Sequence, residues 1–189
     1  MNRIRFAFVA LMLASMMVMV GLQATNAQDS TPISVPTATS EGCDQVSGYV
    51  EARKQIAEEL LDGIASVFPT VATPVIDHGD ELLAAMMVMT PEQTKQLGDV
   101  YDATAEKIEK MENVPAIAQF YHEQIVALYR ASAKTFHEAA TTDLNTAGQK
   151  YSMELSAIAT AIDTYGSSAT AVCSDFADII EIDQTQATL

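Results

Sequence analysis

The apolar residues between positions 144 and 179 recur with a strict four-three alternation. The positions are Leu144, Gly148, Tyr151, Leu155, Ile158, Ile162, Tyr165, Ala169, Val172, Phe176 and Ile179. A mean repeat of about 3.5 residues is slightly shorter than one α-helical turn, so the stripe stays on one face only when neighbouring helices cross with a left-handed, coiled-coil-like geometry. The stretch therefore predicts a long helix in a helix bundle.

An amphipathic helix is also expected from Asp44, whose side chain can cap free backbone amides, to the break at Pro69. Its stripe consists of Val46, Tyr49, Arg53, Ile56, Leu60, Ile64 and Val67. The opposite face is rich in Glu, Gln and Asp, as on the solvated side of such a helix.

A capping box predicts the start of the next helix. Thr90 is a suitable N-cap, Pro91 suits the first helical position, and Gln93 stands three residues after the cap. A short helix around Met86 precedes this box. Because the heptad register continues across Pro91, a single kinked helix is the alternative.

A third long helix is expected after the break at residues 113–115, and short connections follow the second and third helices. Short connections make consecutive helices antiparallel neighbours. The predicted fold is therefore all-α, an up-down-up-down four-helix bundle with a short extra helix, closed by one disulfide.

The disulfide is predicted between Cys43 and Cys173, the two cysteines of the chain. An even number of spanning helices brings both to the same end of the bundle, whereas an odd number separates them by about 37 Å. Closing such a long loop removes roughly 5 kcal/mol of chain entropy from the unfolded state. An intermolecular bridge is the alternative.

The N-terminal region reads as a secretory signal peptide at residues 1–27, with Arg3 and Arg5 preceding an apolar run and small residues ending at Ala27. An uncleaved anchor is the alternative, because the run reaches the lower limit for a membrane span. Residues 28–42 are rich in Ser, Thr and Pro and are expected to form a solvated spacer. The bundle domain is then 43–180, and 181–189 is expected to be a flexible acidic tail.

Charge excludes some partners. The chain has 10 Lys and Arg against 25 Asp and Glu, and a net charge of −15. Nucleic acids require a basic surface, so they are poor partners. After signal cleavage we expect no membrane insertion. The signal peptide predicts an exported location, secreted or at the cell surface, and in such an oxidising compartment a disulfide between the two cysteines is expected.

The weak candidates for a metal site are His78, Met86, Met87 and Met89, because thioether and imidazole ligands suit copper(I). Methionine is also an ordinary core residue, which is the favoured interpretation. The Glu-x-x-His pairs of di-iron bundles are absent, and so is the motif for covalent haem. No metal or other cofactor is therefore expected, and His122 is expected at a half-solvated boundary.

No catalytic motif is visible, because both cysteines are assigned to the bridge and no nucleophile-elbow sequence occurs. The sequence therefore predicts an exported, non-catalytic bundle that acts through contacts with a protein partner or a second copy. The alternative is a bundle outside the cytoplasm that binds a small ligand or a metal, such as copper or haem.

The predicted contact residues are Phe176, Ile179 and Ile180. If the fourth helix continues straight past Cys173, its end overhangs the bundle and leaves an unpaired apolar stripe, which usually marks a contact site. The alternative is that these side chains fold back on the corner near Met111 and Val114.

Overall fold

The computed structural model describes residues 32–71 and 78–187. Within these ranges the chain forms helices and contains no strand. The long helices are α2 (Val46–Val67), α4 (Pro91–Glu109), α5 (Gln119–Ala139) and α6 (Leu144–Val172), and the shorter elements are η1 (Cys43–Gln45), α3 (Gly79–Met86), η3 (Ala116–Ala118) and α7 (Phe176–Ala187). The predicted signal peptide, residues 1–27, lies outside the described residues.

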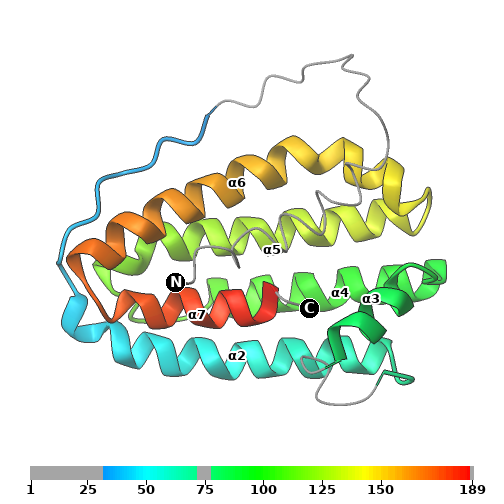
Figure 1. The fold of residues 1–189 in the computed structure, drawn as a ribbon, viewed down its shortest axis with the longest axis horizontal. Helices are drawn as coiled ribbons and strands as arrows, with labels where there is room; N and C mark the ends of the chain where they lie inside the picture. The colour runs from blue at the N-terminus through cyan, green and yellow to red at the C-terminus, as the bar shows by residue number, and fades with distance from the viewer. Residues whose placement is uncertain (1–31, 72–77, 188–189) are drawn as a thin grey trace.

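The four long helices lie side by side, and successive ones run in opposite directions (Figure 1). Helix α4 packs against α2 and α5, and α5 also packs against α6. The last helix, α7, turns back after α6 and contacts both α2 and α6 (Figure 1). The all-α prediction is confirmed, and α7 is an additional helix that the sequence analysis did not separate from α6.

The break between α6 and α7 corrects the prediction of one straight helix over residues 144–179. Helix α6 ends at Val172, and its C-cap Cys173 has an extended backbone, with φ −145° and ψ 103°. Because the chain reverses there, the end of the predicted seam does not overhang the bundle. Phe176 and Ile179 are instead fully buried.

The capping box at Thr90 is confirmed. The Gln93 backbone N–H donates to the Thr90 hydroxyl at 3.2 Å, and the Thr90 backbone N–H donates to the Gln93 side chain at 3.0 Å. Pro91 is the first residue of α4, while α3 ends at Met86. The chain therefore makes a corner between two helices at residues 87–90, and the alternative of a single kinked helix is wrong.

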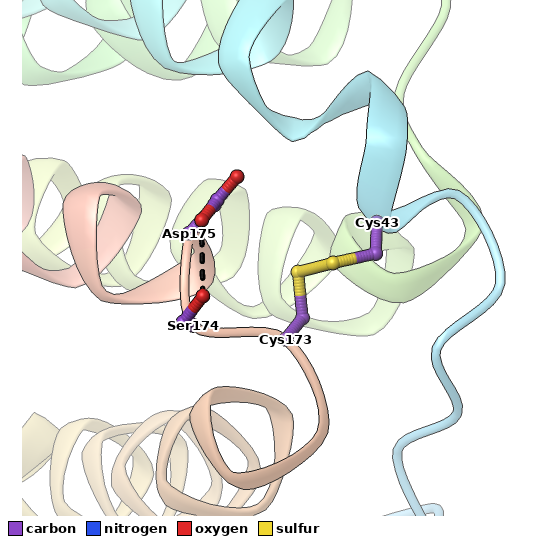
Figure 2. The surroundings of a disulfide bond; sticks show 4 residues. All are labelled: Cys43, Cys173, Ser174 and Asp175. Atoms are coloured by element: carbon purple, nitrogen blue, oxygen red, sulfur yellow. Dashed lines mark hydrogen bonds between the residues drawn. A yellow bond between two sulfur atoms is a disulfide. The ribbon is translucent and has the colours of Figure 1, made fainter.

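The disulfide between Cys43 and Cys173 is confirmed. The two Cα atoms are 5.8 Å apart, and the bridge joins positions separated by 130 residues. Figure 2 shows the bridge from Cys43, in η1 directly before α2, to Cys173, which is followed by the turn that carries Ser174 and Asp175. The bridge therefore fixes the point from which α7 begins.

The described part of the predicted spacer lies against the bundle. Ala38 is buried in the core, and Ile33 and Val35 are partly buried against it. The backbone N–H of Ile117 donates to the carbonyl of Glu41 at 2.9 Å. Residues 32–42 thus pack against the bundle, because the apolar side chains of Ile33, Val35 and Ala38 contact the core.

The predicted flexible tail is corrected over residues 181–187, where α7 continues to Ala187, and residues 188–189 lie outside the described residues. Ile182 is 8% exposed, and the carboxylate of Asp183 pairs with Arg53 of α2. These two contacts hold a stretch whose acidic composition suggested a solvated end.

None of the helices in the described ranges has an apolar stretch long enough to cross a bilayer.

Candidate functional site

A buried ion pair joins α2 to α7. Arg53 lies on the apolar stripe of α2 and is 1% exposed, and its guanidinium contacts the carboxylate of Asp183, whose side chain is 13% exposed. A buried charge is costly unless it is paired, so the two residues depend on each other. Arg53 Nε is buried without a hydrogen-bond partner among the described residues.

The environment of the pair acts on both ionisable groups. Burial alone would lower the pKa of Arg53, but the neighbouring Asp183 carboxylate raises that pKa above its ordinary value. Burial raises the pKa of Asp183, while the guanidinium opposes this shift. The guanidinium therefore remains charged, and the pair is an attraction between α2 and α7 in a region of low dielectric constant.

Helix α5 adds polar side chains to this region. The Tyr49 hydroxyl of α2 lies 3.0 Å from His122 Nδ1, and His122 is 8% exposed. Burial lowers the pKa of His122, and the Arg53 charge lowers it further. A hydrogen bond therefore joins the phenol to the imidazole inside the bundle. The expectation of a half-solvated His122 is wrong, because its side chain is buried against this partner.

The tyrosines around the ion pair are weak acids. Burial raises the pKa of Tyr49, Tyr121 and Tyr129 well above the ordinary value of a phenol. A general base or a nucleophile needs the opposite shift. We call Tyr49, Arg53, Tyr121, His122, Tyr129 and Asp183 the buried polar cluster. Its groups are arranged to hold α2, α5 and α7 together.

The pairing of Asp183 with Arg53 was not predicted from the sequence, although a signal was present. The four-three alternation through Val172, Phe176 and Ile179 continues to position 183, where an aspartate stands. The stripe of α2 likewise contains one charged residue, Arg53. A single charge of each sign at seam positions of two helices indicates an interhelical pair.

The predicted contact residues on α7 are corrected by their burial. Phe176 and Ile179 are 0% exposed, and Ile180 is partly buried against the core. The ring of Phe176 meets the rings of Tyr121 and Tyr165 edge to face, with centroids 5.4 Å and 6.2 Å apart. Phe176 and Ile179 are therefore core side chains and are not accessible to a second protein.

The weak metal candidates lie before α3 (His78), at its last residue (Met86) and after it (Met87 and Met89). His78 precedes the helix and its Nδ1 lies 3.3 Å from a carboxylate oxygen of Glu81, whereas Met86 is the last residue of the helix. Eight residues of α-helix separate His78 from Met86 by about 12 Å. Among the described residues, no three His, Cys, Asp or Glu side chains gather in a group that could hold a metal ion.

The three methionines do not share one environment. Met86 and Met89 are partly buried against the core, whereas Met87 is 64% exposed. Val88 beside it is 78% exposed, and the other large apolar side chains exposed on the described surface, Met153 and Val172, reach 44% and 46%. The corner between α3 and α4 therefore presents the most exposed pair of adjacent apolar side chains. We call Met87 and Val88 the apolar corner.

An open hollow of about 340 Å³ lies near the N-terminal end of α2. It is lined by Gln45, Gly48, Tyr49, Ala52, Met111, Glu112 and Asn113. Glu112 is the one carboxylate side chain in this lining, and burial raises the pKa of the Tyr49 phenol. The hollow therefore brings together no acid–base pair.

Comparisons with protein families, with characterised proteins and with solved structures find no match to this chain.

Proposed function

We propose that the protein is an exported, non-catalytic helical bundle that acts through protein contacts at or outside the cell surface. The apolar corner is the single observation that carries this proposal. Met87 and Val88 are 64% and 78% exposed, whereas Met153 and Val172, the other exposed large apolar side chains of the described residues, reach 44% and 46%. Adjacent exposed apolar side chains at a rigid corner are suited to insertion into a partner's pocket.

The fold supports this proposal by holding the corner in place. Thr94 and Leu97 anchor the start of α4, and Leu82 anchors α3, because all three side chains are buried. The capping box fixes the first turn of α4 directly after the corner. Because the contact residues stand on an ordered scaffold, binding would require little ordering of the chain, which favours affinity.

The exported location is supported by the disulfide. The Cys43–Cys173 bridge is intramolecular, and bridges of this kind persist in oxidising compartments outside the cytoplasm.

Site-specific crosslinking tests the proposal. A photoreactive amino acid is placed at position 88, in place of Val88, and the variant is irradiated on the cells that produce the protein. A matched variant carries the same amino acid in place of Val172, which is also exposed. The proposal expects one protein partner crosslinked from position 88 and not from position 172. Equal or absent crosslinking from the two positions would contradict it, as would stoichiometric copper or haem in the purified protein.

A further inference from the structure

The Lys and Arg side chains of the described residues share one property: every one of them is already paired within the chain. Arg53 pairs with Asp183, Lys54 with Glu51, Lys95 with Asp99, Lys107 with Glu59, Lys110 with Glu106, Arg130 with Glu109, Lys134 with Glu154 and Lys150 with Glu138. The surplus charge of the described surface therefore consists of carboxylates.

The apolar corner lies in a stretch of the chain that has carboxylates and no cation to balance them. Residues 78–94 contain Asp80, Glu81 and Glu92, all exposed, and no Lys or Arg. The first cation after the corner is Lys95, whose Nζ lies 2.8 Å from the carboxylate of Asp99. The apolar corner is thus bordered along the chain by negative charge alone.

The helix geometry places one of these carboxylates on the same face as the corner. Counted from Asp80, Ala84 lies four residues later, Met87 seven and Val88 eight. All four side chains are exposed. Asp80 and Ala84 are one turn apart on the same face of α3, and Met87, the C-cap of the helix, keeps a helical backbone, with φ −67° and ψ −18°. Glu92 follows Val88 by four residues, in the first turn of α4. One exposed carboxylate therefore precedes the apolar corner on α3, and another follows it at the start of α4.

From this arrangement we propose that the apolar corner binds a cationic, amphipathic segment of a partner protein, whose apolar side chains cover Met87 and Val88 and whose Lys or Arg side chains face Asp80, Glu81 and Glu92. The inference rests on the proposed function and adds the chemistry of the partner. A second copy of this chain does not fit, because it would bring the same carboxylates to the interface and carries a net charge of −15.

Binding of a synthetic peptide tests this inference. The probe is a helical 14-residue peptide of Leu and Lys, compared with a peptide in which Glu replaces each Lys. We expect micromolar binding of the Lys peptide by calorimetry, weakening as salt is raised, and no binding of the Glu peptide.

Matched variants locate the binding. Met87→Ser with Val88→Ser should weaken the Lys peptide at least tenfold, whereas Met153→Ser with Val172→Ser should leave its affinity unchanged. Asp80→Asn with Glu81→Gln and Glu92→Gln should weaken it and flatten the salt dependence. Equal affinity for all variants would overturn the inference, because it would show general attraction to an acidic surface.

The remaining outcomes also decide between occupants. Concentration-dependent dimers that disappear in the Met87→Ser and Val88→Ser variant would assign the corner to a second copy. Sedimentation with phosphatidylcholine vesicles that depends on Val88 would assign it to a membrane. If position 88 crosslinks a partner but the Lys peptide fails to bind, the cationic partner is wrong and the proposed function stands.

Discussion

The α7 side of the bundle and the corner between α3 and α4 treat apolar and charged side chains in opposite ways. Against α2, the short helix α7 buries Phe176 and Ile179 completely and carries Asp183 into the interior. At the corner, Met87 and Val88 face solvent. The difference indicates that α7 serves the stability of the fold, whereas the apolar corner is not needed for stability and is available for contact.

The largest effect on this comparison is expected from the disulfide, which fixes the start of α7. Replacing both cysteines, Cys43→Ser with Cys173→Ser, should lower the free energy of unfolding by about 4–5 kcal/mol, because the unfolded chain regains the entropy of a long loop. Urea denaturation measures the change. An unaltered unfolding midpoint would show that α7 is held without the bridge.

The buried ion pair is expected to have the next largest effect. Asp183→Ala leaves the Arg53 charge buried and unpaired, which should lower the free energy of unfolding by about 3–5 kcal/mol. Asp178→Ala is the matched control, because Asp178 lies on the same helix and is exposed.

A double variant separates the cost of an unpaired charge from the worth of the pair. Arg53→Met with Asp183→Leu should restore most or all of the stability, since apolar replacements of a buried pair are often neutral or stabilising. If Asp183→Ala were as stable as Asp178→Ala, the pair would not hold α7.

The buried side chain of Ile179 on α7 should contribute somewhat less to the free energy of unfolding than the ion pair does. Ile179→Ala removes a fully buried side chain and should cost about 2–4 kcal/mol. Ile180→Ala is the control, because Ile180 is only partly buried and should cost less. Thermal unfolding followed by circular dichroism measures both. Lost association of Ile179→Ala with a partner, at unchanged stability, would return α7 to the role of a contact site.

His122 should produce a smaller effect that depends on pH. Burial lowers the pKa of this imidazole in the folded protein below its ordinary value of 6.5. The unfolded chain therefore binds the proton first, so stability present above pH 6.5 should decline as pH falls through and below that value. His122→Gln should remove this part of the decline, and identical pH profiles of the two proteins would contradict it.

The apolar corner should give the smallest change in stability. Met87→Ser with Val88→Ser alters two exposed side chains, so the free energy of unfolding should change by less than about 0.5 kcal/mol. A loss comparable to that of Ile179→Ala would place the corner in the core and remove the comparison.

Helix positions and the bridge could be predicted from the sequence because they depend on local signals. The capping box at Thr90 and the stripe of α2 are encoded over a few turns, and the cysteine pairing followed from the number of spanning helices. The packing of residues 32–42 could not be predicted, because single apolar residues such as Ala38 without a period give no signal before the core is known.

The predicted contact residues Phe176 and Ile179 are buried for a physical reason. A continuous seam through Phe176 and Ile179 favours one helix, but the extended backbone at Cys173 reverses the chain and turns the seam inward. Methionines next to a seam usually fill a core, yet the short helix α3 ends before it can bury Met87. Both errors concern where a helix ends, which tertiary packing decides.

Hydrogen exchange of the protein with and without the Lys and Leu peptide tests the central claim most directly, because it observes both regions at once. The account predicts that the peptide slows exchange of backbone amides in residues 84–92 and leaves those of residues 176–183 unchanged. Slower exchange in residues 176–183, with no change in residues 84–92, would contradict it and make α7 the contact site.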